Sequence, residues 1–509
     1  MPKIRIREVD NTGTVSSSEI PNVVYIPGPA ISAVDPELFT SAKAFNNAIH
    51  AEGSKYSAGS LSEKMAYHLL SLGMHVLYEG VVVSGGTGDP AKFNGSVDAV
   101  EDETTHDKLF EIDNVKFTIN AEGNVVSWEK PNPQDSTTPI TGTATIATED
   151  NVYQATITNG IIANLEDNLL KFDFITNKVY YVKTYSVTGQ PLSATWKAIW
   201  EKLTDKNLYD VRFLTTGQFF ADNDNALDML TCAATRCDAV ALLDFKATND
   251  TVDEYRNAAE AVETASEALT LNAKDPAAFA TAFAPKWKGN VSTESGVEAI
   301  DNLPPSFAYL CAFARSVKEN PMWYAVAGSF RGTIPELIEV KRKYTTADVE
   351  RLQARGRTVE VALDVSGDNV GVAINPIAYR RPFGYLIYGD RTLRRNLADE
   401  VTGVGKLKAT SFLNCRILST EVAKVSYNAS NKYQFEQNSE TLWTNFISYI
   451  LPTLDRMATG NGVLDYRIER VATDKRARLS AKILLEPIEP VEDFDVEIEL
   501  TDSISVSAS

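Results

Sequence analysis

The sequence predicts a mixed α/β fold of several domains, with an extended strand at each end. Three observations predict it. Helix-like and strand-like patterns alternate over residues 21–87 and 186–344, which favours a parallel sheet covered by helices. Between residues 88 and 185, Thr, Asn, Asp and Val prevail and turn signals recur, which is typical of an inserted all-β module. Both termini alternate apolar and charged residues and have no adjacent partner strand.

Length and composition limit the class of protein. At 509 residues the chain exceeds the size of one hydrophobic core, so we expect roughly two to four domains. The net charge of −19 argues against nucleic acid as a partner, because phosphate binding needs a cationic surface. No apolar run reaches membrane-spanning length, and residues 1–10 lack the apolar centre of a signal peptide. We therefore expect synthesis in a cytoplasm and no membrane insertion.

Cysteines and histidines predict neither a metal site nor a cofactor. No CxxC pair is present, and the four histidines all precede residue 107. The apolar surroundings of the cysteines predict buried, reduced thiols at Cys232, Cys237, Cys311 and Cys415.

The first α/β segment is predicted from its turn and cap signals. Residues 21–28 form an apolar strand closed by a Pro-Gly turn. Asp35-Pro36 has the form of a helix N-cap followed by proline, so we expect a helix from there towards His50. The next expected elements are a helix from Ser62 to Gly73 and a strand over residues 74–83.

After the β module the helix and strand patterns resume. The expected elements are a helix carrying Trp196, Ile199, Trp200 and Leu203, a strand over 208–216, a helix from Asn223 to Arg236, a strand over 239–245, a helical segment over 252–271, a loop from Lys286 to Ser295 and a helix after Pro304-Pro305. A last module follows near Thr345, with a helix to Gln353, strands over 358–365, 370–376 and 383–389, a strand-like stretch over 412–418 followed by a helix, a helix from Glu440 to Ala458, and strands over 463–471 and 478–488.

The two terminal strands have opposite charges. The first alternates Ile4 and Ile6 with Lys3, Arg5 and Arg7. The last alternates apolar and acidic residues: Phe494, Asp495, Val496, Glu497, Ile498, Glu499 and Leu500. Because an unpaired strand edge is a template for another chain, we expect both termini to be arms that connect subunits.

Candidate catalytic residues are few. Asp244 ends the strand over 239–245, where open α/β sheets place ligands, so one alternative is an α/β enzyme with an accessory β domain and a site near Asp244. No partner histidine or second carboxylate is identifiable, and a cap or turn is the commoner role. Another alternative is an envelope or surface-array protein. A further cationic group, which is either partner-facing or salt-bridged, comprises Arg391, Arg394 and Arg395.

The C-terminal third resembles contractile tail sheath proteins. Residues 379–393 are similar to the segment in which a glycine-containing strand leads into a W-G-A-R-T-L motif. The matching residues are Gly384, Gly389, Arg391, Thr392 and Leu393, with Tyr388 in place of the tryptophan and Asp390 in place of the alanine. Three further segments follow in the family's order, through Arg416, through Phe435, Glu436, Asn438 and Trp443, and through Pro487, Pro490 and Glu492.

This resemblance implies a structural subunit without catalytic residues. Such subunits form stacked hexameric rings in a helical lattice around an inner tail tube, their arms add strands to neighbouring sheets, and contraction drives the tube through a target cell envelope. The implied partners are further copies of the chain, the tube protein, and baseplate and tail terminator proteins. The implied location is a virion tail or injection particle assembled in a host cytoplasm.

The resemblance also implies a division of the chain. It gives an N-terminal arm over 1–20, an α/β middle domain over 21–87 and 186–344, an outer β domain over 88–185, an inner, tube-facing domain over 345–490 and a C-terminal arm over 491–509. The cationic candidates for the tube-facing surface are Arg467, Arg470, Lys475, Arg476 and Arg478.

Overall fold

The computed structural model describes most of the chain. The described residues are 22–30, 32–51, 54–83, 95–112, 115–132, 138–149, 152–158, 161, 165–183, 190–271, 273, 275–354, 371–397, 407–472 and 478–491. The expected strand over 358–365 therefore lies outside the described residues, as do both terminal strands.

An eight-stranded sheet with the order β2-β3-β1-β14-β15-β16-β20-β21 forms the centre of the body. The pairs from β3 through to β20 are parallel, which confirms the predicted parallel sheet. The strands are β1 (Val23–Ala30), β2 (Val34–Phe39), β3 (His75–Val82), β14 (Phe213–Leu214), β15 (Val240–Leu243), β16 (Ala280–Ala284), β20 (Asn375–Arg380) and β21 (Gly384–Ile387).

Helices cover both faces of this sheet, as expected for buried parallel strands. Alternate residues of β1 enter different cores: Val23 and Tyr25 one, Val24 and Ile26 the other. The first core is closed by α3 (Ser193–Leu203), α4 (Asn223–Arg236) and α5 (Val252–Glu267). The second is closed by α1 (Ala42–Ile49), α2 (Leu61–Ser71) and α6 (Pro305–Glu319). Two shorter helices are α7 (Gly328–Arg331) and α8 (Thr346–Leu352).

The helix expected at Asp35-Pro36 is wrong, because these residues belong to β2. This strand is at the edge of the sheet, and its register shifts between Val34 and Glu37. Proline is tolerated there, because an edge or bulge position does not need its N–H. The following helix α1 begins later and has its N-cap at Ser41, whose Oγ accepts the Ala44 N–H at 3.2 Å.

Two further segments differ from the sequence prediction. The expected loop at 286–295 contains β17 (Trp287–Thr293), which pairs with β18 (Gly296–Leu303) and β19 (Leu337–Val340). Trp287 is fully buried in the second core, which fixes the strand. The strand-like stretch 412–418 is mostly the first turns of α9 (Leu413–Lys432). Residues 413–418 are all buried, so they show no apolar stripe from which a helix could be predicted.

A β-sandwich is inserted between β3 and α3. Its two sheets have the orders β10-β11-β12-β13-β4 and β5-β6-β7-β8-β9. Its own apolar core contains Phe110, Phe117, Trp128 and Phe172. The strands are β4 (Gly95–Asp98), β5 (Val100–Glu101), β6 (Lys108–Ile112), β7 (Val115–Ile119), β8 (Val125–Lys130), β9 (Ile140–Thr145), β10 (Ala147–Glu149), β11 (Val152–Thr156), β12 (Leu165–Asp173) and β13 (Lys178–Lys183). We call these strands the β module.

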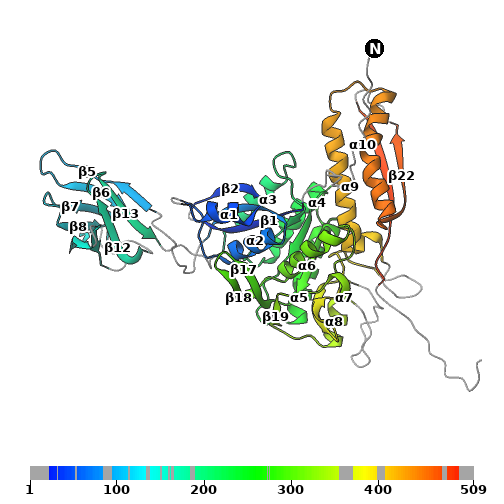
Figure 1. The fold of residues 1–509 in the computed structure, drawn as a ribbon, viewed down its shortest axis with the longest axis horizontal. Coiled ribbons are helices and arrows are strands. Elements are labelled where there is room, and N and C mark those ends of the chain that lie inside the picture. Colours follow the sequence, from blue (N-terminus) through cyan, green and yellow to red (C-terminus); the bar gives the residue numbers. More distant parts are fainter. Residues whose placement is uncertain are drawn as a thin grey trace, which may run out of the picture.

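A helical hairpin and a strand pair form the opposite end of the molecule from the β module (Figure 1). Helix α9 lies beside α10 (Glu440–Thr459), and β22 (Val463–Val471) pairs with β23 (Ser480–Pro487). A separate apolar core joins them, with Val425, Phe446, Ile450 and Leu454 among its buried residues.

Polar contacts attach α9 to the body. Arg416 donates from Nε to the Ala278 carbonyl at 2.9 Å and lies over the Phe279 ring at 4.0 Å. Further along α9, Glu421 accepts a hydrogen bond from Arg212 at 2.6 Å, and both side chains are fully buried. Arg212 Nε and Glu421 Oε1 have no hydrogen-bond partner among the described residues. The pair therefore joins the helix to the sheet at a considerable desolvation cost.

We predict that Arg212→Met lowers the free energy of unfolding by about 3–5 kcal/mol, because it leaves the Glu421 carboxylate buried without its partner. The double variant R212M/E421L should recover most of this loss. Urea denaturation of the full chain measures both. As a control, Arg351→Met removes a partner of the exposed Asp253 and should change stability by about 1 kcal/mol or less. A double variant no more stable than R212M would contradict this account.

Candidate assembly interface

The ribbon of β22 and β23 is backed on one face. Tyr466 is opposite Leu485 and Ile468 is opposite Ile483 in the register, and all four pack against the core of α9 and α10. The opposite face carries Arg467, Lys482 and Leu484 among other exposed residues. The register shifts between Val463 and Asp465, which reverses the in-and-out alternation of side chains at this point. Val463 and Tyr466 therefore both point inward, although they are three residues apart.

Both outer edges of this ribbon are open within the described part of the chain, because its sheet contains β22 and β23 alone. Each edge presents backbone N–H and C=O groups that a further strand can pair with. A two-stranded ribbon is marginally stable by itself, so added strands stabilise it. The arrangement is suited to strand addition on both sides.

The base of the ribbon is fixed by the body. The Ile488 N–H donates to the Gly462 carbonyl at 3.0 Å, and the Ile488 carbonyl accepts from Asn414 at 3.4 Å. Trp323 donates from its indole to the Gly460 carbonyl at 3.0 Å. Beyond this anchor the chain reaches Val491, which is 72% exposed. The last described residue thus lies at the surface.

The motif residues at 384–393 are positioned by Asn375. Its side-chain Oδ1 accepts the Arg391 N–H at 2.8 Å, and its Nδ2 donates to the Arg391 carbonyl at 2.8 Å. A Cβ on Gly389 would lie 2.7 Å from Asn375 Oδ1, so this approach needs glycine. Leu393 is buried and donates its N–H to Ala280 of β16 at 2.7 Å. The motif therefore joins the C-terminal residues to the central sheet.

Sequence reasoning missed Asn375, because a single buried amide has no periodicity. The asparagine precedes a proline inside an apolar run, and this unusual polar residue is the one signal that could have pointed to it. Its neighbours in the motif are fixed as well. Gly384 has a φ of +82°, and Thr392 donates from Oγ1 to the Thr410 carbonyl at 2.8 Å.

The cationic residues 391, 394 and 395 contact their own chain. Arg391 is buried and lies 4.7 Å from the Phe412 ring centroid. Arg394 pairs with Asp275 at 3.3 Å and Arg395 with Glu263 at 2.7 Å. The salt-bridged alternative therefore describes Arg394 and Arg395, whereas Arg391 is buried in the fold.

The predicted tube-facing cations differ in their exposure and contacts. Arg467 is 75% exposed beside Glu469, whereas Arg470 turns towards Glu440, at 2.5 Å, and the Trp443 ring. Arg478 is also exposed.

The remaining predicted residues have these positions. Trp443 is half-buried and stacks on Phe446, Glu436 is exposed, and Pro490 lies in the segment after β23. The predicted residues that lie outside the described part are Lys3, Ile4, Arg5, Ile6, Arg7, Lys475, Arg476, Glu492, Phe494, Val496, Glu497, Ile498, Glu499 and Leu500.

The enzyme alternative depends on Asp244. This residue follows β15, is fully buried and lies against the first turn of α6. Its Oδ1 accepts the Ser306 N–H at 2.9 Å, and its Oδ2 accepts the Ser306 hydroxyl. Burial raises the pKa of Asp244 to about 7. These bonds satisfy donors in the first turn of the helix, so the carboxyl group has a structural role there.

The fold also brings His68, Cys311 and Glu336 within 4.8 Å of one another, which sequence spacing did not indicate. The Ser292 N–H donates to His68 Nδ1 at 3.0 Å, so the ring proton of the neutral imidazole is on Nε2, which faces Glu336 at 3.3 Å. Burial lowers the pKa of His68 to about 4 and keeps it neutral. A protonated Nε2 has no lone pair for a metal, and Glu336 is paired with both His68 and Arg315, so these contacts within the protein account for the buried His68 and Glu336.

Fold and site together define an α/β protein with an inserted β module and a C-terminal ribbon open to strand addition. Within the described residues, no helix is both long and apolar enough to cross a bilayer. No family model and no curated protein sequence matches the chain.

Among solved structures, the chain is similar to one in the six-fold symmetrised baseplate of the anti-feeding prophage, with a TM-score of 0.43, 14% identity, and coverage of 62% of this chain and 75% of that chain. It is also similar to a chain in the contracted sheath complex of an extracellular contractile injection system, PVC, with a TM-score of 0.40, 19% identity, and coverage of 58% and 72%.

We predict a pH-dependent stability difference between the wild type and Asp244→Asn. The pKa of Asp244 is raised on folding, so between about pH 4 and pH 7 the folded state holds a proton that the unfolded state releases. The stability of the wild type relative to Asp244→Asn should therefore be highest near pH 4 and fall through this window, by on the order of a few kcal/mol. Thermal denaturation at a series of pH values measures it. A constant difference from pH 4 to pH 8 would show that the pKa is not raised.

Proposed function

We propose that the chain is the structural subunit of a contractile sheath. It polymerises around an inner tube through strand-exchanging terminal arms and contracts to drive the tube through a target cell envelope. One observation carries the proposal: within the described residues the ribbon has two open edges, and both terminal segments of the sequence alternate apolar and charged residues. The ordered motif matches support it, and Asn375 and Ala280 of the central sheet hold Arg391 and Leu393 of that motif in place.

The two arms match the two edges in number and in chemistry. An arm of about ten extended residues spans roughly 30 Å, which is enough to reach a neighbouring subunit. The exposed face of the ribbon mixes acidic and basic residues, including Asp465, Arg467 and Lys482. A basic arm and an acidic arm can therefore each find opposite charges, which sets the register and disfavours pairing of like arms.

In this assembly the helical hairpin and ribbon belong to the inner domain, over residues 345–490, and the β module belongs to the outer domain, over 88–185. Their positions at opposite ends of the molecule support this orientation (Figure 1). Arg467 and Arg478 are exposed and remain candidates for contact with the tube. The copies form stacked hexameric rings, and baseplate and terminator proteins occupy the ends of the polymer.

Deleting residues 491–509 tests the role of the C-terminal arm. The truncated chain should fold, because none of these residues belongs to a described apolar core and Val491 is exposed at the surface. It should not polymerise, because one ribbon edge of each copy stays unpaired. Circular dichroism checks the fold, and negative-stain microscopy checks for tubes or rings. Ordered tubes from the truncated chain would exclude the arm mechanism, and flat sheets from the intact chain would favour a surface-array protein.

Charge reversal tests whether electrostatic pairing selects the arms. Replacing Lys3, Arg5 and Arg7 with Glu should block tube formation, and adding Lys at Asp495, Glu497 and Glu499 should partly restore it. A matched control reverses the same number of charges at exposed body positions, Lys43, Lys55 and Lys197, and should still form tubes. Equal loss of assembly in the control would attribute the effect to net charge alone.

A further inference from the structure

We propose that the outer face of the β5–β9 sheet is a binding site for a neutral carbohydrate chain. This sheet belongs to the β module, which has its own core and lies at the end of the molecule away from the ribbon (Figure 1). Its solvent-facing side is hollowed, with a volume of about 730 Å³. Small-molecule sites commonly have volumes in this range.

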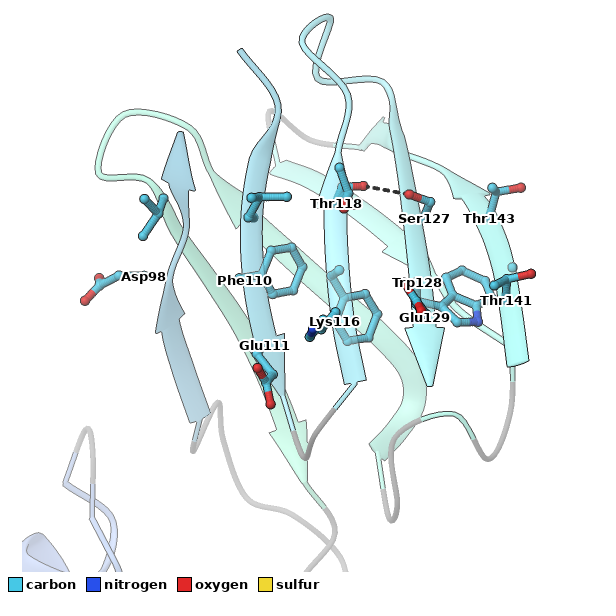
Figure 2. Close-up of a pocket in the computed structure, with 14 residues that line it drawn as sticks. Asp98, Phe110, Glu111, Lys116, Thr118, Ser127, Trp128, Glu129, Thr141 and Thr143 are labelled. Atoms are coloured by element: carbon cyan, nitrogen blue, oxygen red, sulfur yellow. Dashed lines mark hydrogen bonds between the residues drawn. The ribbon is translucent and has the colours of Figure 1, made fainter. Parts of the chain in front are cut away.

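The hollow carries a row of hydroxyl groups. Thr118, Ser127 and Thr143 are opposite one another on three adjacent strands, β7, β8 and β9. Figure 2 shows them side by side, with the Ser127 hydroxyl donating to the Thr118 carbonyl at 3.3 Å. Adjacent strands are about 4.8 Å apart, so the row offers repeated groups that both donate and accept hydrogen bonds. A ligand bearing many hydroxyl groups matches this row.

A second row is charged and carries one more negative than positive group. Lys116 is opposite Glu111 on one side and Glu129 on the other, and Thr141 follows on β9. The carboxylates accept hydrogen bonds from ligand hydroxyls, and the ammonium group donates. Two carboxylates beside one ammonium disfavour an anionic ligand. The row therefore selects a neutral polyhydroxylated chain rather than a phosphate or a sulfated polymer.

The end of the hollow at β5 and β6 is apolar. Val100 is 68% exposed and Leu109, its partner in the register, is 42% exposed. Sugar rings have C–H faces that can pack on such side chains, while their hydroxyls reach the polar rows. A peptide strand fits less well, because strand addition uses the backbone groups of a sheet edge and the hollow is on a sheet face.

Packed aromatic residues on the inner side of the same sheet hold its outer face in a fixed shape. Trp128 is buried beneath β9, and a Cβ on Gly142 would lie 2.3 Å from its ring. The indole therefore occupies the space that a side chain at 142 would need. Phe110 stacks on Phe117 at 4.9 Å beside it. The outer residues are thus presented by a packed, rigid layer.

A glycan array probed with the full chain tests the proposal, followed by calorimetric titration of the neutral oligosaccharide that binds best. The double variant T118V/S127A should weaken binding roughly tenfold or more, since it removes two hydrogen-bonding groups. The matched control Thr156→Val makes the same kind of change on the exposed side of the opposite sheet and should bind as the wild type does.

Absence of binding to every neutral glycan would overturn the proposal, and so would unchanged affinity in T118V/S127A. Binding confined to anionic glycans and abolished by Lys116→Ala would also overturn it. If T118V/S127A does not fold, Leu109→Ser at the apolar end serves the same purpose, with the same loss expected. Tube formation is a separate readout, because these residues lie far from the ribbon.

Discussion

The proposed assembly depends on the backbone groups along the two edges of the β22–β23 ribbon, which pair with no further strand in the described part of the chain. A strand edge can be satisfied by water or by another strand, and the second choice builds a specific contact. The ribbon cannot shift or unfold freely, because Tyr466 and Ile468 are packed on the helical hairpin. Its edges are therefore presented in a fixed orientation, which is what a repeating lattice requires.

The attachment of the hairpin to the body has a different chemistry. The first turns of α9 place Leu413 and Ile417 in the second apolar core, and polar contacts add to this packing, with Arg416, Glu421 and Lys424 each paired to the body. Such contacts are directional, so they fix one orientation of the hairpin more strictly than an apolar surface would. Incompletely satisfied groups at Arg212 and Glu421 make that orientation costly. In the proposed contractile sheath, this geometric precision would matter more than maximal stability.

Strong local signals predicted much of the fold. Helix α4 has the predicted bounds, Asn223 to Arg236, because Asp222 caps one end and Cys237 ends the other in a left-handed conformation. The prediction failed where tertiary contacts decided the outcome. Residues 413–418 are buried on every side, so their helix has no amphipathic pattern, and Pro36 is accommodated by an edge strand. Asp35-Pro36 has the sequence form of a helix start, but the helix begins later, with its N-cap at Ser41.

Only part of the candidate assembly interface could be predicted from the sequence, for a related reason. Amphipathic strands such as β22 and β23 show their faces in the sequence. The role of Asn375 and the intramolecular pairing of Arg394 and Arg395 depend on residues far away in the chain. Charge alone could not tell a partner-facing arginine from one that neutralises its own carboxylate, because both leave the same pattern.

Hydrogen–deuterium exchange of the ribbon amides tests the central claim most directly. The full-length chain is compared as monomer and as polymer, and the chain lacking residues 491–509 is measured beside it. The account predicts that amides at the outer edges of residues 463–471 and 480–487 exchange quickly in the monomer and in the truncated chain, and become strongly protected in the polymer. Equal protection in all three states would contradict it, because the edges would then be paired or covered without any arm from another subunit.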